Sequence, residues 1–264
     1  MPAGQREKGA LIRRLLYVVS PLAAASLWEF VAQMGWIDVR FFPAPSKIVA
    51  TAVEMMYSTN ALTGENAYFA HLTASMSRVF WGTICGFFPG LFIGLTMGLF
   101  PNFRSVVSPL VAITYPIPKI AILPLLLMIF GLSEATKIIV IAIGVFFLVL
   151  INTLNGVLQI PQIYFEVSEV FKIGVVRRFF RIVLPGAFPF VFTGLRLGVG
   201  YGLVLIVAAE FVSKSGLGYL IWESWELFLV ERMYVGLVSI SLLGYVLNLV
   251  LERLEARLVP WAGH

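Results

Sequence analysis

Charged residues are scarce in this sequence. Only 12% of its 264 residues are Asp, Glu, Lys or Arg, whereas 59% are hydrophobic. An average soluble domain carries about 25% charged residues. Together with a mean hydropathy of +0.93, the shortage of charge excludes a soluble globule and indicates an integral membrane protein.

Cysteine and histidine are nearly absent as well. The single cysteine, Cys85, lies inside an apolar run, which excludes an intrachain disulfide and disfavours a reactive thiol. The two histidines, His71 and His264, leave almost no material for a His/Cys metal site. The net charge of +5 does not indicate a nucleic-acid partner, because the basic residues lie between apolar segments rather than on one solvated face.

Enzymatic motifs are missing too. The sequence has no G-x-x-x-x-G-K-[ST] phosphate loop, so this chain cannot by itself cradle ATP in that way. An intramembrane enzyme would need a nucleophile with a base or an H-E-x-x-H helix, and neither is present. The sequence therefore predicts no catalytic residues and no bound cofactor or metal.

Six apolar segments are long enough to cross a membrane, because a bilayer core of about 30 Å needs roughly 20 helical residues. Lys119 interrupts one of them, Arg196 another, and the first contains Glu29. We predict an all-α polytopic membrane protein with six transmembrane helices. The segments are 15–36, 79–103, 105–133, 138–165, 182–209 and 233–251.

The N-terminus has two interpretations. Arg13 and Arg14, followed by the apolar run 15–28, could be the start of a cleaved signal peptide. We favour a retained first helix, because the distribution of basic residues then distinguishes the cytoplasmic side of the membrane from the other side more clearly. On this basis residues 1–14 form a cytoplasmic N-terminal segment and residues 15–264 a single transmembrane domain.

Basic residues predict the orientation, since cytoplasmic loops carry an excess of Lys and Arg. Eleven fall on the side of the termini and five on the other, while Arg78 lies at a boundary. We therefore predict that both termini are cytoplasmic. The eleven are Arg6, Lys8, Arg13, Arg14, Arg104, Lys172, Arg177, Arg178, Arg181, Arg253 and Arg257, and the five are Arg40, Lys47, Lys137, Lys214 and Arg232.

One long cytoplasmic loop, residues 158–185, follows from this orientation. Pro161 opens it and Pro185 closes it. Helical spacing covers residues 164–180, with Gly174 dividing the stretch into two short helices. Periodicity alone favours an amphipathic connector that lies at the lipid interface.

At this loop the sequence resembles the inner-membrane components of binding-protein-dependent ABC importers. The signature of that family is an EAA motif, a glycine and then Leu-Pro. Ser168 stands where the family usually has Glu, and the stretch from Gly174 to Leu184 is shorter than usual. The matching text is Ser168-Glu169-Val170, Phe171-Lys172-Ile173, Gly174 and Ile182-Val183-Leu184-Pro185.

Six stretches in this order resemble the nitrate, sulfonate and taurine branch of the family. They cover nearly all of the chain from residue 40. The stretches are Pro43 to Ser46, Tyr115 to Pro124, Phe130 to Lys137, Leu184 to Arg196, Gly216 to Gly218 and Val259 to Trp261.

This resemblance implies a type I ABC importer permease in the bacterial inner membrane, carrying a small anionic solute. It implies a permease dimer, separate ATPase subunits that bind ATP and Mg, and an extracytoplasmic substrate-binding protein. Taurine, other sulfonates, nitrate, bicarbonate, pyrimidine precursors and aromatic acids remain open as substrates.

The alternative is a secondary transporter driven by an ion gradient, which predicts paired acids within the spans. Only Glu29 and Glu210 are available, both near span ends.

An ATP-driven permease needs a stiff cytoplasmic element wedged into its ATPase, and the loop is the only candidate. Apolar side chains would supply anchor area and charged ones would fix the register, while Gly174 would permit a sharp turn. The predicted coupling residues are Phe165, Ser168, Glu169, Val170, Phe171, Lys172, Gly174, Arg177 and Arg178.

Polar residues inside the spans are candidates for the translocation pathway. Lys119 follows two prolines that free backbone carbonyls, and it either lines the pathway or extends toward the nearer surface. Arg196 either contacts the substrate or a gate, or pairs with an acid or a partner backbone, and Glu29 and Glu210 are candidate acids by type only. The predicted pathway residues are Tyr115, Pro118, Lys119 and Arg196.

Glycines recur at every fourth position from residue 82 to residue 98. Small residues at that spacing lie on one face of a helix and let backbones approach closely. We predict that this stripe packs against another helix, either within the subunit or across a dimer. The stripe consists of Gly82, Gly86, Gly90, Gly94 and Gly98.

Overall fold

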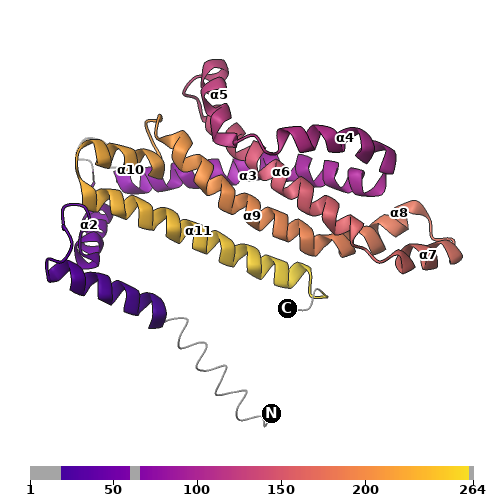
Figure 1. The fold of residues 1–264 in the computed structure, drawn as a ribbon, viewed down its shortest axis with the longest axis horizontal. Helices are drawn as coiled ribbons and strands as arrows, with labels where there is room; N and C mark the ends of the chain where they lie inside the picture. The colour runs from indigo at the N-terminus through magenta and orange to yellow at the C-terminus, as the bar shows by residue number, and fades with distance from the viewer. Residues whose placement is uncertain (1–18, 60–65, 262–264) are drawn as a thin grey trace, which may run out of the picture. The chain divides into compact units, whose positions relative to one another are not determined.

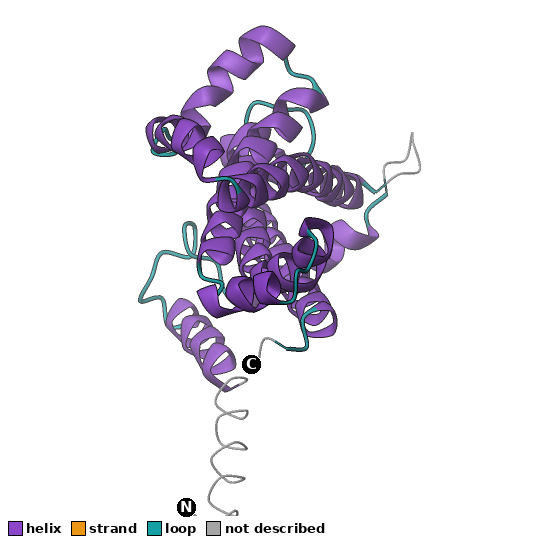
Figure 2. Ribbon diagram, turned by 90° about the vertical axis from the view of Figure 1, so that its right-hand side faces the viewer, coloured by secondary structure: helices purple, strands orange, loops and turns teal. Residues whose placement is uncertain are grey.

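The computed structural model describes residues 19–59 and 66–261. The predicted cytoplasmic segment 1–14 and the first residues of the predicted first span lie outside these ranges. Every regular element in the described residues is a helix, as Figure 2 shows. The all-α fold class is therefore confirmed.

The helices differ widely in length. Residues 19–33 are helical and are followed by α2 (Pro45–Tyr57) and α3 (Ala67–Leu99). The remaining elements are α4 (Pro101–Thr114), η1 (Lys119–Ile122), α5 (Leu123–Phe130), α6 (Glu134–Leu158), α7 (Gln162–Val170), α8 (Val175–Arg178), the π-helix η2 (Phe179–Val183), α9 (Leu184–Glu210), α10 (Leu217–Glu226) and α11 (Val230–Leu258).

Four helical stretches of the described residues are long and apolar enough to cross a membrane: α3, α6, the run Val175–Glu210 and α11. The predicted span 105–133 is not one straight helix. It is broken between α4 and η1, and its two halves are bent by 84°. Pro116 and Pro118 lie in the break, where the missing N–H groups end the helix. The count is four spans, or five with the bent pair, so six is not confirmed.

The described residues form two compact units. The first contains the residues up to Tyr68 together with Ile221–Gly236, and the second contains Phe69–Leu220 and the residues from Leu237 on. In the first unit, Glu29 accepts hydrogen bonds from the backbone N (2.9 Å) and the Oγ (2.7 Å) of Ser46, at the start of α2. All the predicted coupling and pathway residues lie in the second unit.

Helix α6 forms the core of the second unit and lies alongside α9 (Figure 1). Its inward side chains are branched and aliphatic, and Ile141, Val145 and Val149 are fully buried. β-Branched side chains of this kind lose little rotamer freedom on burial. They give α6 a rigid ridged surface on which neighbouring helices pack.

The glycine stripe of α3 packs against α6 of the same subunit. A Cβ atom placed on Gly82 would lie 2.6 Å from Ile141 Cβ, and one placed on Gly90 would lie 2.7 Å from the carbonyl oxygen of Phe146. Both distances are too short for real atoms, so only glycine permits this approach. The packing prediction is confirmed for the contact within the subunit.

We therefore expect Gly90→Ala to lower the free energy of unfolding by about 1–3 kcal/mol, since it overpacks the contact between α3 and α6. The midpoint of thermal unfolding of the purified protein measures this effect. Gly200→Ala, in α9, is the matched control, because its new Cβ would meet nothing within 4 Å. Equal midpoints for the two variants would contradict the packing argument.

Candidate functional site

The predicted coupling loop reverses direction at Lys172. Helix α7 ends at Val170, the Ile173 N donates to the Ser168 carbonyl at 2.8 Å, and Lys172 takes a positive φ of 52°. Gly174 has φ −61° and ψ 152° and begins α8 as its N-cap residue. The expectation that Gly174 makes the sharp turn is therefore wrong, because the chain already reverses at the end of α7.

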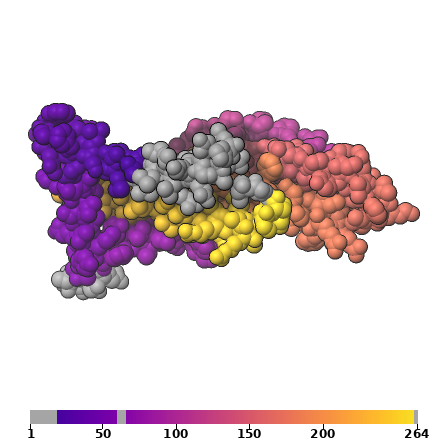
Figure 3. Space-filling view, turned by 90° about the horizontal axis from the view of Figure 1, so that it is seen from below, coloured from indigo at the N-terminus to yellow at the C-terminus, as the bar shows by residue number. Residues whose placement is uncertain are grey.

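Large apolar side chains of this loop face outward. Val170, Phe171 and Val175 are 79%, 74% and 79% exposed, and Val176 and Phe180 are exposed as well. We call these five residues the apolar loop surface. Figure 1 shows α7 and α8 beyond the ends of α6 and α9, and Figure 3 shows this part of the second unit, in salmon, uncovered toward the viewer.

Two predicted coupling residues instead hold the loop to the helices. Phe165 packs against a buried cluster that includes Leu95 and Val183. Ser168 is fully buried, and its Oγ donates to the Phe165 carbonyl at 2.6 Å. A small hydroxyl therefore occupies the position at which the family usually carries Glu.

Charged residues of the loop alternate along the chain with the apolar loop surface. Glu169 and Arg178 approach to 3.5 Å, linking α7 to α8 across the turn. Lys172 and Arg177 are exposed. Charged groups around an apolar centre are typical of the rim of a protein interface.

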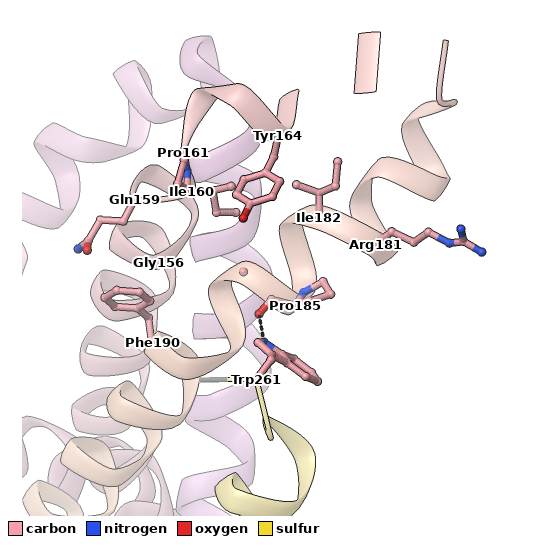
Figure 4. A pocket seen from close by; sticks show the side chains of 11 residues that line it. Gly156, Gln159, Ile160, Pro161, Tyr164, Arg181, Ile182, Pro185, Phe190 and Trp261 are labelled. Carbon is pink, nitrogen blue, oxygen red and sulfur yellow. Dashed lines mark hydrogen bonds between the residues drawn. The ribbon is translucent and has the colours of Figure 1, made fainter. Parts of the chain in front are cut away.

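The C-terminal segment is tied to the helix that follows the loop. Pro189 has no N–H, so the carbonyl of Pro185, one turn earlier in α9, lacks its helical donor. The indole Nε1 of Trp261 donates to that carbonyl at 3.1 Å (Figure 4). Trp261 and Tyr164 both line a cavity of about 290 Å³ at this end of the unit.

Lys119 lies at the break between α4 and η1, buried to 3% exposure. Its Nζ donates to the carbonyl oxygens of Thr114 (2.8 Å), Tyr115 (2.9 Å) and Ile117 (2.9 Å). The Nζ also lies 4.3 Å from the ring centroid of Phe147, within the range of a cation–π contact. Pro118 has no N–H to donate to the Thr114 carbonyl four residues earlier, and the lysine donates to that carbonyl and to the two others.

A cavity of about 490 Å³ opens at this break. The broken helix, α6 and α9 all contribute to its wall. Three of the four predicted pathway residues meet here, and Arg196 is not among them. The lining residues are Tyr115, Pro116, Ile117, Pro118, Lys119, Gly144, Phe147, Leu148, Leu197 and Tyr201.

Arg196 joins α9 to α11. It hydrogen-bonds to Glu255 and lies 3.8 Å from Glu252. The acidic partners suggested by type, Glu29 and Glu210, are not its partners. Sequence reasoning missed the true ones because it ended the last span at residue 251, whereas α11 continues to Leu258.

A charged cluster lies where α3, α6 and α9 meet, buried at Arg78 and Glu210 and exposed at Glu134, and sequence reasoning missed it. Arg78 donates through Nη1 to Glu210 (2.6 Å) and through Nη2 to Glu134 (2.8 Å). Glu134 also accepts from Lys137 at 2.8 Å. Arg78 is 2% exposed and Glu210 is fully buried. The only sequence signal was the position of Arg78 at a span boundary.

The Gly216-Leu217-Gly218 turn encloses the carboxylate of Glu210. Gly218 N donates to it at 2.9 Å, and both of its oxygens accept from Ser75 Oγ at 2.8 Å. Gly216 has φ +111°, and any side chain there would overlap the Glu210 carboxylate. The two glycines are therefore required for a buried acid to be satisfied at the end of α9.

Comparison with known proteins assigns the family. The family described as the binding-protein-dependent transport system inner membrane component matches residues 87–262. This chain belongs to that family. The match includes the loop, the broken helix and the C-terminal segment, and it makes the chain a multi-pass inner-membrane transport component.

Relatives place the chain within the family. The taurine transport system permease protein TauC of Escherichia coli (strain K12) is 29% identical over 255 residues, covering 96% of this chain and 92% of TauC. The putative aliphatic sulfonates transport permease protein SsuC of Bacillus subtilis (strain 168) is 30% identical over 242 residues, covering 91% and 85%. The nitrate import permease protein NrtB of Synechocystis sp. is 33% identical over 188 residues, covering 71% and 68%.

The fold agrees with this assignment. A chain of the MetNI methionine ABC transporter, solved in inward-facing conformations, matches with a TM-score of 0.57 and 20% identity, covering 73% of this chain and 94% of that one. The fold is thus that of a type I ABC importer permease. The chain is an ABC importer permease of the nitrate, sulfonate and taurine family, and the secondary-transporter alternative is not supported.

Proposed function

We propose that this permease carries a small anion across the membrane and that the loop 158–185 couples it to separate ATPase subunits. The observation that carries the proposal is the apolar loop surface. A loop outside the membrane rarely exposes such a patch to water unless it binds another molecule. Its charged rim fits a protein partner better than the lipid interface.

Different residues of the loop would have different roles. Phe171, Val170 and the other members of the apolar loop surface would enter a pocket of the ATPase, and Glu169, Lys172, Arg177 and Arg178 would fix the register. Phe165 and Ser168 would transmit the movement to the membrane helices, because they are packed against them. Gly174 would only begin α8.

The translocation pathway would pass the break between α4 and η1. Discontinuous membrane helices commonly form transport sites, because their free backbone groups are tolerated only beside a cavity or protein. The cavity at Lys119 has that character. Sulfonate and nitrate, the cargo in the names of the relatives, are anions, which agrees with a basic residue in its wall.

The assembly would contain two copies of this permease, two ATPase subunits that bind ATP and Mg, and an extracytoplasmic binding protein. This chain would have no ATPase site of its own, in keeping with the absence of a phosphate loop. Both termini would lie in the cytoplasm, and the excess of basic residues on their side of the membrane supports this orientation. The apolar side chains on the outer faces of the spans would contact lipid.

Co-purification with neighbouring gene products tests this function. We expect an ATPase subunit and a binding protein to remain bound to the tagged permease, and uptake of a sulfonate or nitrate into proteoliposomes to require ATP inside them. Uptake that continues without ATP and stops when an ionophore collapses ion gradients would instead support the secondary transporter.

A further inference from the structure

The ammonium of Lys119 has no acidic partner in the described part of the chain. Every ion pair found there involves other groups. Three backbone carbonyls and the rings of Phe147 and Tyr115 surround it instead. Carbonyl groups and aromatic rings stabilise the ammonium but are neutral, so the wall of the cavity keeps a net positive charge.

The geometry also determines the protonation state of Lys119. A neutral amine has two N–H donors, whereas an ammonium has three. Three carbonyl oxygens lie 2.8–2.9 Å from Nζ, and carbonyl oxygens only accept. All three bonds form together only if Lys119 is charged.

Without the lysine, the same carbonyls would make a cation site. Thr114 and Tyr115 end α4, where the carbonyls carry the negative end of the helix dipole. The Ile117 carbonyl converges on the same point from the turn between the two prolines. Rings of carbonyl oxygens of this kind replace the hydration shell of dissolved cations in membrane proteins.

We propose that Lys119 is a tethered cation, which permanently fills a carbonyl cage and makes the cavity selective for anions. This inference rests on the proposed function and names the group that selects its anionic substrate. An anion in the cavity would be attracted by the fixed charge without taking its N–H groups, which the carbonyls already hold. Attraction without direct ligation lets the anion enter and still leave, as conduction requires.

The apolar part of the substrate would lie against aromatic rings. Tyr115, Phe147 and Tyr201 line the cavity around the lysine. The Lys119 Nζ lies 5.8 Å from the ring centroid of Tyr115 and 4.3 Å from that of Phe147, so both rings stabilise its charge through cation–π contacts. The cavity therefore fits a monovalent anion, either bare or on a short carbon chain.

Two substitutions of Lys119 test the inference in the reconstituted complex with its ATPase and binding protein. Lys119→Met keeps the carbon chain and removes the charge, and we expect anion uptake to fall at least tenfold while the ATPase still co-purifies. Lys119→Ala empties the cage, and we expect added propylammonium, which has three N–H donors, to restore uptake. Tetramethylammonium, which has none, should not restore it.

The control is Lys214→Met, the same change at an exposed lysine outside the cavity, which should transport normally. Wild-type uptake by Lys119→Met overturns the inference, and so does a loss of uptake in Lys119→Ala that propylammonium does not relieve. If the wild-type complex itself shows no ATP-dependent uptake, the proposed function fails instead.

Discussion

Phe171→Asp is expected to abolish ATP-driven uptake and to release the ATPase subunit during purification. Phe171 is 74% exposed and is an aromatic member of the apolar loop surface. An aromatic anchor of an interface contributes 2 kcal/mol or more to binding, about 30-fold in affinity. A carboxylate in an apolar pocket adds a desolvation cost. Co-purification and uptake measure the two effects separately.

Phe171→Leu is the matched control, because it keeps most of the apolar area at the same position and should retain the ATPase. Gly174→Ala should also behave as wild type, since a Cβ there meets nothing within 4 Å and its φ of −61° suits any residue. The Phe171 variants should still accumulate in the membrane, because the exposed Phe171 side chain packs little against the rest of the second unit. Normal uptake by Phe171→Asp would show that the loop is not the coupling element.

Arg78→Met should strongly destabilise the second unit. The substitution leaves the fully buried carboxylate of Glu210 without its counter-charge. Breaking a buried ion pair from one side costs about 3–5 kcal/mol. For a protein of this size that corresponds to a fall of roughly 6–20 °C in the midpoint of thermal unfolding.

A double-mutant cycle with Glu210→Gln isolates the interaction. Glu210→Gln alone leaves Arg78 paired with Glu134 and should cost less. The double variant should be more stable than the sum of the single effects, by about 0.5–3 kcal/mol, because neither charge is then left unpaired. Additive effects would mean that Arg78 and Glu210 do not interact, and would remove the proposed link between α3 and α9.

Short sequence patterns predicted the structure correctly where a residue type fits only one kind of environment. The glycine stripe of α3 requires a closely packed neighbour whatever the fold, and α6 provides it. Pro116 and Pro118, two residues apart, were expected to free backbone carbonyls, and the helix breaks where they lie. By contrast, Gly174 was taken for the turn because glycine favours a positive φ, whereas the chain reverses at Lys172.

Pairs of distant charges could not be predicted in the same way. Arg78 meets Glu210, 132 residues later, and Arg196 meets Glu255, 59 residues later. From the sequence alone, Arg78 is a residue at a span boundary and Arg196 is a costly charge within a span. Nothing in the spacing along the chain indicates which acid lies beside which base.

The sequence by itself determined that this protein is a helical membrane protein, because so few charges and so many apolar residues leave no other way to bury its surface. It also indicated the family and predicted the coupling loop, because both depend on residues that are neighbours in the chain. Only the tertiary structure decided that Lys119 lies against Phe147 of α6 and that α3, α6 and α9 share a charged cluster. Those groups are far apart in the chain and are brought into contact by helix packing, which acts through space.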